Sequence, residues 1–308
     1  MQRQKVFIIG GGGMVGATAA YAIAIAGLVD DIVLIDVNEK LAWGQSADIN
    51  DALGLDSAVR VKVGDYSDMS DNDIAIIASG VSQKPGQTRH DLVDTNASIA
   101  KEVTDKIIAT GKQPFIIVVT NPVDVLTYLV LKQSGLPRSR VFGTGTTLDT
   151  SRLRSAIADM SDVDSGEVEA YVMGEHGDSS FSTIESASIG EIPLSQYPNF
   201  NLEDIKDIDS RIQKRAYDIV ESKGSTHFAI GQVLAKIVDA LTHDSKSVLP
   251  VCSLMDGEYG LSDVVLSMPS LVSNQGVSVL DGYPLSDPES VKLKNSADVI
   301  SGLIGRYR

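Results

Sequence analysis

Residues 5–16 read KVFIIGGGGMVG, an apolar run followed by four consecutive glycines. The short apolar run favours a buried strand, and the alanine-rich segment after it favours a helix. Residues 11–16 match the pattern G-x-G-x-x-G. A strand, a glycine turn and a helix in this order are typical of a dinucleotide-phosphate site. Gly10 adds one glycine more than the pattern requires, so the register of the turn is open by one residue.

The glycine turn predicts a cofactor site built largely from backbone. We expect Gly11 to permit the tight turn, Gly13 to let N–H groups approach a pyrophosphate, and Gly16 to let the helix pack closely on the strand. Met14 and Val15 open the helix and belong to the same predicted site, since helix N-terminal amides and the positive end of the dipole favour phosphate.

Asp36 ends the next predicted strand, 20 residues after Gly16. A carboxylate at this position would accept hydrogen bonds from the ribose hydroxyls of adenosine and would repel a 2′-phosphate. The sequence therefore favours NAD over NADP as the cofactor. The structural alternative is an acid that forms the turn before Val37 and Asn38.

The rest of the first half alternates short apolar runs with helical patterns, which predicts a parallel sheet covered on both faces. We expect strands at residues 5–10, 32–36, 60–64, 74–79, 115–120 and 140–143, and helices at residues 14–28, 39–52, 92–110 and 123–134. In the second half we expect helices at residues 147–160, 202–221, 226–242 and 290–306. Strands are expected there at residues 169–173, 245–251, 264–267, 270–273 and 276–280, with antiparallel pairing. The prediction is an α/β protein with an N-terminal Rossmann domain, a doubly wound parallel sheet, at residues 1–143. A C-terminal α+β domain follows at residues 144–308.

Composition narrows the classes of partner. The net charge of −15 argues against a nucleic-acid backbone or an anionic membrane as partner, but not against a small anionic ligand held by local arginines. Cys252 is the only cysteine, which excludes an intrachain disulfide and a Cys-rich zinc site. We expect Cys252 to be a small buried residue, no metal site, and a cytoplasmic location.

One apolar stretch admits a different interpretation. Residues 7–29 carry no charge and are long enough to span a bilayer, and basic residues precede them as in a secretory signal. The four glycines inside the stretch make a poor helix. We therefore expect neither a membrane span nor a signal peptide.

Two short blocks in the second half carry groups suited to acid–base chemistry. Residues 148–152, LDTSR, place Asp149 and Arg152 three apart, so both side chains can share one face of a helix. Residues 174–178, GEHGD, contain His176, whose imidazole can give and take a proton near pH 7. The Asp149 carboxylate could orient the imidazole, and the Arg152 guanidinium could hold a substrate carboxylate. Together these groups suit the transfer of a hydride and a proton onto a small 2-oxo acid. The structural alternatives are a helix N-cap for Asp149 and a surface ion pair for Arg152.

With these motifs the chain resembles the L-lactate/malate dehydrogenase family, and within it most closely the bacterial L-lactate dehydrogenases. Four blocks carry the likeness in order: QKPGQTR (83–89), TNPVD (120–124), GTGTTLD (143–149) and GEHGD (174–178). The resemblance implies an NAD-dependent reduction of pyruvate to L-lactate in a homotetramer, with a dimer as the alternative. It makes His176 the proton donor and acceptor, Asp149 its partner, and Arg152 the group that binds the substrate carboxylate.

The resemblance also assigns four residues around the substrate. Arg89 would polarise the reacting carbonyl from a loop that closes over the site, and Asn121 would hydrogen-bond substrate or nicotinamide. Gln83 stands where malate dehydrogenases have an arginine, so a dicarboxylate is disfavoured, and Thr226 would contact the substrate side chain. The structural alternatives are an exposed helix-start arginine for Arg89, backbone capping for Asn121 and a helix N-cap for Thr226.

Several related functions remain open at this point. A dehydrogenase of longer L-2-hydroxy acids, of the 2-hydroxyisocaproate type, is the main alternative, because His90 and His227 are unusual for the family pattern. Malate dehydrogenase and a non-catalytic NADH-sensing protein are weaker ones. Many bacterial relatives are activated by fructose 1,6-bisphosphate through an arginine and a histidine. Arg154 matches the arginine, but Glu169 replaces the histidine and would repel a phosphate, so we expect weak or absent activation.

Overall fold

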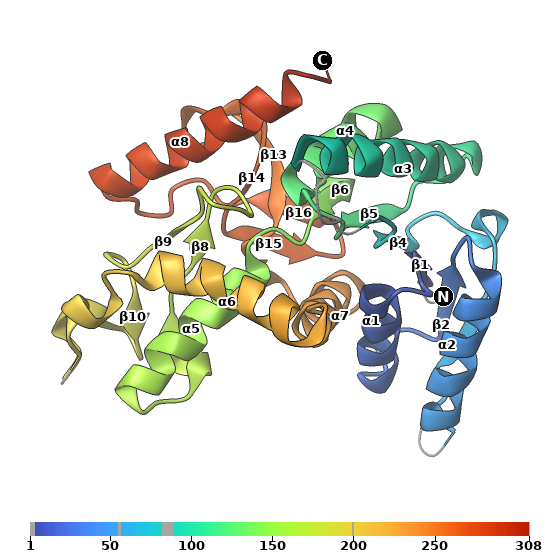
Figure 1. The fold of residues 1–308 in the computed structure, drawn as a ribbon, viewed down its shortest axis with the longest axis horizontal. Helices are drawn as coiled ribbons and strands as arrows, with labels where there is room; N and C mark the ends of the chain where they lie inside the picture. The colour runs from blue at the N-terminus through green and yellow to red at the C-terminus, as the bar shows by residue number, and fades with distance from the viewer. Residues whose placement is uncertain (1–3, 55–56, 82–88, 199, 308) are drawn as a thin grey trace.

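A mixed sheet of eight strands forms the centre of the computed structural model, which describes residues 4–54, 57–81, 89–198 and 200–307 (Figure 1). Six strands pair in parallel in the order β6-β5-β4-β1-β2-β3, and β13 and β14 extend the sheet beyond β6 with antiparallel pairing. In chain order the first half contains β1 (Val6–Ile9), α1 (Met14–Ile25), β2 (Asp31–Ile35), α2 (Glu39–Leu53), β3 (Arg60–Val63), β4 (Ile74–Ile77), α3 (Arg89–Ala109), β5 (Phe115–Val118), α4 (Val123–Ser134) and β6 (Val141–Gly143).

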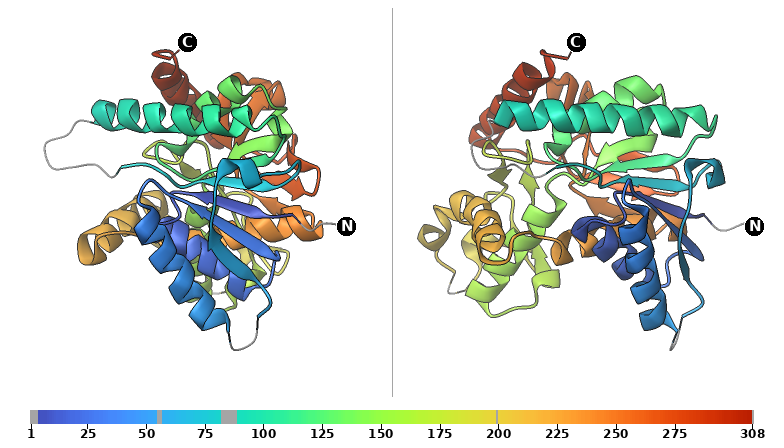
Figure 2. Two further views of the ribbon diagram at one scale, coloured as in Figure 1. Left: turned by 90° about the vertical axis from the view of Figure 1, so that its right-hand side faces the viewer. Right: turned by 45° about the vertical axis from the view of Figure 1, so that its right-hand side comes forward.

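The parallel strands are buried on both faces, which is why they read as continuous apolar runs. Alternate residues of one strand enter different cores: Val6 and Ile8 pack with α1 and α2, whereas Phe7 and Ile9 pack with α3 and α4. Figure 2 shows this layering, with α1 and α2 below the sheet and α3 and α4 above it in the left-hand view. The layering confirms the predicted doubly wound parallel sheet.

The glycine turn lies at the point where the strand order changes direction. β1 pairs with β2 on one side and with β4 on the other, so the chain leaves β1 first toward one edge of the sheet and later toward the other. The connections that follow β1 and β4 therefore run to opposite sides of the sheet and leave a crevice at the carboxyl ends of these two strands. Open α/β sheets bind their ligands in such a crevice. Residues 10–13 lead from β1 directly into α1 at this crevice.

The second half contributes helices and short antiparallel strands around the end of the sheet. It contains α5 (Thr147–Ser161), β7 (Val168–Glu169), β8 (Val172–Met173), β9 (Phe181–Ser182), β10 (Ser188–Ile189), β11 (Ile192–Pro193), α6 (Ile208–Lys223), α7 (Phe228–His243), β12 (Ser247–Leu249), β13 (Cys252–Asp256), β14 (Ser262–Ser267), β15 (Ser270–Ser273), β16 (Gly276–Val279) and α8 (Asp287–Ile304). Helix α7 packs against α1, where a Cβ on Gly231 would lie 2.8 Å from Thr18 Cγ2. Cys252 is fully buried, as expected.

Several predicted elements of the second half are wrong in their bounds. The strand expected at residues 245–251 is shortened to β12, because Pro250 cannot donate to a ladder. The strand β13, which begins at Cys252 and belongs to another sheet, was not predicted. The strand expected at residues 169–173 is split into β7 and β8. The helix expected at residues 202–221 is a 3₁₀ turn (Leu202–Ile205) followed by α6. Helix α8 begins three residues earlier than expected, where Ser286 and Glu289 form a capping box.

The fold class is confirmed, whereas the division into domains at residues 143 and 144 stays a prediction. Strands β13 and β14 of the second half complete the sheet of the first half, so the two halves share one sheet. Within the described part of the chain no helix is long and apolar enough to cross a membrane. Most of the uncharged residues 7–29 form β1, the glycine turn and α1.

Candidate active site

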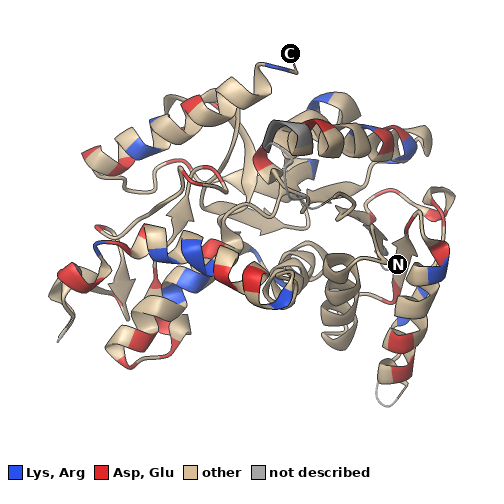
Figure 3. Ribbon diagram, in the orientation of Figure 1, with Lys and Arg blue, Asp and Glu red and all other residues tan. Residues whose placement is uncertain are grey.

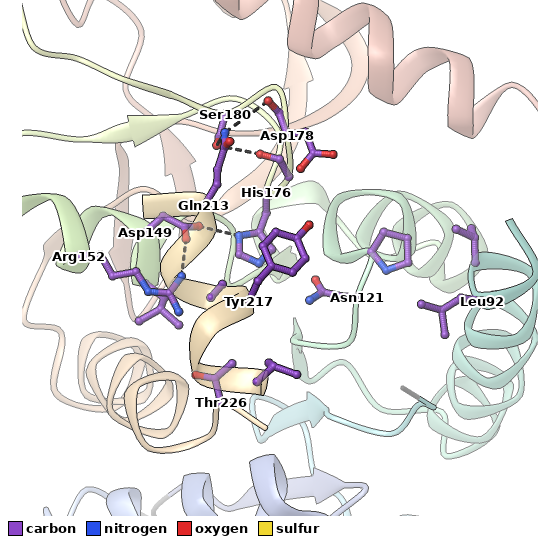
Figure 4. A pocket seen from close by; sticks show the side chains of 16 residues that line it. Leu92, Asn121, Asp149, Arg152, His176, Asp178, Ser180, Gln213, Tyr217 and Thr226 are labelled. Carbon is purple, nitrogen blue, oxygen red and sulfur yellow. Dashed lines mark hydrogen bonds and ion pairs between the residues drawn. The ribbon is translucent and has the colours of Figure 1, made fainter. Parts of the chain in front are cut away.

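Asp149 joins His176, its predicted catalytic partner, to Arg152, the residue predicted to bind the substrate carboxylate. Its Oδ2 lies 2.7 Å from His176 Nδ1, and its Oδ1 accepts a hydrogen bond of 2.9 Å from Arg152 Nη1. Figure 4 shows the carboxylate between the guanidinium and the imidazole. Because Asp149 accepts the proton on Nδ1, Nε2 of His176 is the ring atom left to exchange a proton with a substrate.

Helix α5 supplies the carboxylate and the guanidinium. Its N-cap is Thr146, so the interpretation of Asp149 as the N-cap is wrong. Asp149 and Arg152 lie three residues apart on one helical face, and their side chains are only 11% and 9% exposed. Arg152 is therefore a buried residue and not part of a surface ion pair. Among the described residues Asp149 is the acceptor for Arg152, which leaves other guanidinium N–H groups for a substrate carboxylate.

The loop between β8 and β9 presents His176. It begins at Gly174, whose positive φ of 89° and close approach to Ser296 exclude a side chain: a Cβ would lie 2.4 Å from Ser296 Oγ. The buried Glu175 carboxylate accepts the backbone N–H of Ser179 at 3.2 Å and fixes the loop from inside. His176 is 26% exposed, so its ring is held by protein on one side and is accessible on the other.

The charges in this cluster shift its proton equilibria. Burial lowers the pKa of His176, but the negative charge of Asp149 and its hydrogen bond outweigh burial and hold the pKa above the usual value. Burial raises the pKa of Asp149, and the cationic His176 and Arg152 more than reverse this, so the carboxyl stays ionised. The cluster therefore stabilises a protonated imidazole beside an ionised carboxylate.

A cavity of about 360 Å³ opens beside these residues. Its walls come from the start of α3, the segment before α4, helix α5, the loop that carries His176, and helix α6. The lining residues are Leu92, Val93, Asn121, Pro122, Leu148, Asp149, Arg152, His176, Gly177, Asp178, Ser180, Gln213, Ala216, Tyr217, Val220 and Thr226. The cavity thus collects side chains from both halves of the chain.

The contribution of α6 to the cavity was not predicted from the sequence. Gln213 lies against the His176 loop, where its Nε2 is 3.3 Å from Ser180 Oγ, and Tyr217 is 66% exposed at the cavity. Residues 213, 216, 217 and 220 follow the i, i+3, i+4, i+7 spacing of one helical face. That spacing is a usable signal, but the many charged residues of the same helix obscure it in the sequence.

The charge that can bind an anion at the cavity is local. Helices α5 and α6 carry acidic residues among the basic ones (Figure 3), and the chain as a whole has a net charge of −15. Arg152 lies in the cavity itself, whose lining also includes Asp149 and Asp178. A small anion would therefore be recognised by the Arg152 guanidinium and not by a positive patch.

The glycine turn is packed too closely for side chains at two of its positions. Gly10 has a positive φ of 91°, and a Cβ there would lie 2.6 Å from Ser79 N, so the tight turn falls at Gly10 and not at Gly11. A Cβ on Gly16 would lie 2.3 Å from Gly10 O, which agrees with the close packing expected at Gly16. Helix α1 begins after Gly13 without a side-chain cap, which leaves its first amides for a phosphate.

Asp36 stands directly beside the turn. Its Oδ2 accepts the backbone N–H of Gly12 at 2.9 Å, and its Oδ1 accepts that of Asn38 at 2.9 Å. The hydrogen bond from Asn38 is the one expected if Asp36 forms a turn, which was the structural alternative. The hydrogen bond from Gly12 joins Asp36 to the glycine turn. A Cβ on Gly12 would lie 3.0 Å from Asp36 Oδ2, so the glycine keeps space around this carboxylate open.

Both halves of the chain match models of one protein family. The family model described as lactate/malate dehydrogenase, NAD binding domain, matches residues 4–143, and the model of the alpha/beta C-terminal domain of the same family matches residues 146–304. The chain belongs to the lactate/malate dehydrogenase family. Membership in this family agrees with the resemblance inferred from the four sequence motifs.

Individual members of the lactate/malate dehydrogenase family are similar over almost the whole chain. The L-lactate dehydrogenase of Latilactobacillus sakei is 38% identical and that of Thermoanaerobacter sp. 40% identical. These alignments cover 98% and 97% of this chain and 94% and 98% of the two relatives. The crystal structure of a minor L-lactate dehydrogenase from Enterococcus mundtii in the ligands-bound form has a TM-score of 0.96 at 37% identity. The structural alignment covers 100% of this chain and 99% of the Enterococcus mundtii chain.

The remaining residues predicted from this family fall in two groups. Asn121 and Thr226 line the cavity. The N-caps of the helices that follow them are Pro122 and His227, neither with a side-chain capping bond, so the capping alternatives for Asn121 and Thr226 are not what the structure shows. Gln83 and the side chain of Arg89 lie outside the described residues, and their roles stay predictions.

Proposed function

We propose that this chain is an NAD-dependent L-lactate dehydrogenase that reversibly reduces pyruvate to L-lactate. The observation that carries the proposal is the Asp149 carboxylate bridging His176 and Arg152 at one cavity. It places a proton donor and a carboxylate-binding cation on the same wall. The similar proteins named above are called L-lactate dehydrogenases, and they cover the chain nearly end to end.

The residues at the switch point fit a dinucleotide. Gly13, Met14 and Val15 would present backbone amides and the N-terminus of α1 to the pyrophosphate, and Asp36 would accept the ribose hydroxyls. A 2′-phosphate would meet the Asp36 carboxylate, which supports NAD over NADP. When bound, NADH supplies the hydride.

The protein side chains then bind, orient and protonate the 2-oxo acid. Arg152 would hold the substrate carboxylate through its guanidinium N–H groups. Asp149 holds the His176 ring with Nε2 free, and the imidazolium gives its proton to the carbonyl oxygen as that oxygen gains negative charge. Asn121 would donate to the same oxygen or to the nicotinamide, and Arg89 would add positive charge near the carbonyl. In the reverse direction neutral His176 takes the hydroxyl proton of lactate.

Helix α6 supplies the part of the cavity that would face the side chain of the 2-oxo acid. The Ala216, Tyr217 and Val220 side chains form a wall of the cavity that suits a methyl group or a longer apolar chain. The second candidate is a dehydrogenase of longer 2-oxo acids, whose apolar side chains would pack on the same wall. Gln83, neutral, would leave a second carboxylate unpaired.

A substrate comparison tests the proposed function. We expect kcat/KM for pyruvate, followed by NADH absorbance, to exceed that for oxaloacetate by about 100-fold or more, since an unpaired buried charge costs several kcal/mol. Higher kcat/KM for 2-oxoisocaproate than for pyruvate would identify the second candidate. A preference for oxaloacetate, or no turnover of any of the three acids, would refute the proposal.

Activation by fructose 1,6-bisphosphate is expected to be weak or absent. Arg154 Nη2 lies 3.4 Å from Glu169 Oε2, and its guanidinium stacks over Tyr171, so its charge is already paired with a carboxylate. A bisphosphate would have to displace Glu169 and tolerate its charge. Pyruvate titrations with and without the bisphosphate should give the same apparent KM. A large fall in KM would show that the site accepts phosphate despite Glu169.

The family resemblance and the composition support three further properties of the protein. We propose a homotetramer, with a dimer as the alternative, a cytoplasmic location, and a functional division near residues 143 and 144. Size-exclusion chromatography with light scattering distinguishes the two assemblies.

A further inference from the structure

His227 is a buried histidine that the proposed chemistry does not use. It is the N-cap of α7 and is only 5% exposed, although it lies in the short turn between α6 and α7. Its side chain makes no capping bond to the helix that follows. The residue before it, Thr226, lines the cavity, and so does Tyr217 of α6 (Figure 4). The imidazole is thus placed directly behind one wall of the cavity.

Both nitrogens of the His227 ring have partners across the turn. Lys223 Nζ lies 3.2 Å from Nε2, and Ser225 Oγ lies 3.0 Å from Nδ1. An ammonium can only donate a hydrogen bond, so Nε2 is the unprotonated acceptor. Nδ1 then carries the ring proton and donates it to the Ser225 hydroxyl. The contacts therefore define a neutral imidazole of one tautomer, which joins the last residue of α6 to the turn.

The C-terminal half of α6 has little apolar packing to hold it in place. The buried residues of this helix are Ile208 and Ile212, and both lie in its first half. Tyr217 and Val220 lie in its second half and line the cavity, but they are 66% and 45% exposed. Because packing does not fix this half of the helix, its position depends on polar contacts such as the one between Lys223 and His227.

Protonation of His227 would break this contact. A second ring proton would occupy Nε2, remove the acceptor and place an imidazolium beside the ammonium. Among the described residues the charge that faces the ring is that of Lys223 from α6, and this charge and burial both lower the pKa of His227. Ser225 from the turn and Phe228 from α7 supply the neutral contacts. The Phe228 ring also holds the ammonium, since its centroid lies 4.2 Å from Lys223 Nζ.

We propose, resting on the dehydrogenase function above, that His227 is a positioning residue whose neutral ring ties Lys223 to the turn and so holds Thr226 and the end of α6 at the cavity. Protonation of the ring releases Lys223, and the substrate then meets a wall that is no longer fixed. The loss falls on substrate binding and not on the proton transfer, because His176 lies on the separate loop after β8. His227 itself does not line the cavity.

The pH dependence of KM tests this role. Pyruvate reduction is measured between about pH 5 and about pH 8, a range that includes the usual histidine pKa. We expect KM of the parent to rise about tenfold at the acidic end, with kcat at saturating pyruvate within about twofold of its neutral value. His176 only becomes more protonated as pH falls, which favours pyruvate reduction, so its own titration cannot produce this loss.

Three variants separate the contact from the titration. His227→Gln offers Lys223 a carbonyl oxygen in place of Nε2 and does not titrate, so its KM should not rise at acidic pH. Lys223→Met removes the donor and keeps the apolar stem, so its KM should be raised about tenfold already at neutral pH, with kcat retained. Lys214→Met makes the same change at an exposed lysine of α6 that does not line the cavity, and it should behave as the parent does.

NMR without cofactor or substrate gives a readout that is independent of turnover. The His227 ring signal, identified by its absence in His227→Gln, should titrate below the usual histidine value in the parent. It should titrate at higher pH in Lys223→Met, where the neighbouring charge is gone. The Thr226 methyl signal, identified by its absence in Thr226→Ser, should shift with the same midpoint as the His227 ring, because the two residues move together.

The outcomes distinguish this inference from the proposed function. If the parent reduces none of the 2-oxo acids, the dehydrogenase function fails, but the two NMR titrations still test the contact. A Thr226 signal that does not respond to the His227 titration overturns the inference, and so does an unchanged KM in Lys223→Met. If His227→Gln does not fold, Lys223→Met carries the test, since Lys223 is exposed and its loss leaves the buried ring in place.

Discussion

Replacing His176 by asparagine should lower kcat for pyruvate reduction by about 10²- to 10⁴-fold, the usual worth of a positioned general acid. Asparagine can still donate a hydrogen bond to Asp149, which lies 2.7 Å from the ring nitrogen in the parent. It cannot carry a transferable proton near pH 7, so the carbonyl oxygen would have to take its proton from water. Stopped-flow measurement of NADH oxidation, with enzyme saturated by pyruvate, gives the comparison directly.

A second histidine supplies the control. His243 also pairs with a carboxylate, its Nδ1 lying 3.1 Å from Asp239 Oδ1, but it is 53% exposed and does not line the cavity. His243→Asn should retain the activity of the parent. Both variants should bind NADH as the parent does, measured by nucleotide fluorescence. If His176→Asn kept more than a tenth of the parent kcat, His176 would not be the proton donor.

Arg152→Lys should lower kcat/KM for pyruvate by about 10²- to 10³-fold, although it conserves the charge. The guanidinium donates one N–H group to Asp149 and has others in a fixed plane for the substrate carboxylate. Lysine presents a single ammonium that cannot reproduce two parallel hydrogen bonds, and each charge-assisted bond contributes about 1.5–3 kcal/mol. Steady-state kinetics over a range of pyruvate concentrations measures the loss.

The matched control lies two residues further along the same helix. Arg154 faces away from the cavity, pairs with Glu169 and stacks on Tyr171. Arg154→Lys makes the same chemical change on α5 without touching the substrate site, so kcat/KM for pyruvate should stay close to that of the parent. Equal losses in the two variants would mean that Arg152 acts through helix stability and not through the substrate.

Much of the first half could be predicted from sequence because its signals are local. A parallel strand buried on both faces is a continuous apolar run, as in β1 and β4, and a helix after a glycine turn has its own composition. The spacing of Asp149 and Arg152 likewise predicts a shared helical face without knowledge of the rest of the chain. The bounds of the helices and strands in the second half were harder to predict, because strands of two residues such as β7 and β8 are too short to show a periodic pattern.

The amino-acid sequence alone determined the parallel sheet, the glycine turn and the chemical types in the catalytic set, since these depend on side-chain polarity and on neighbours within a few residues. No pattern within the sequence places Asp149 beside His176, 27 residues away; the family resemblance implied this pairing, and the tertiary structure shows it. Only the tertiary structure decided that Asp124 meets the His176 backbone from α4. It also decided that β13 joins β6 and that α6 turns Tyr217 toward the cavity. The physical reason is that these contacts follow from how separate buried surfaces pack together, which no local pattern along the chain records.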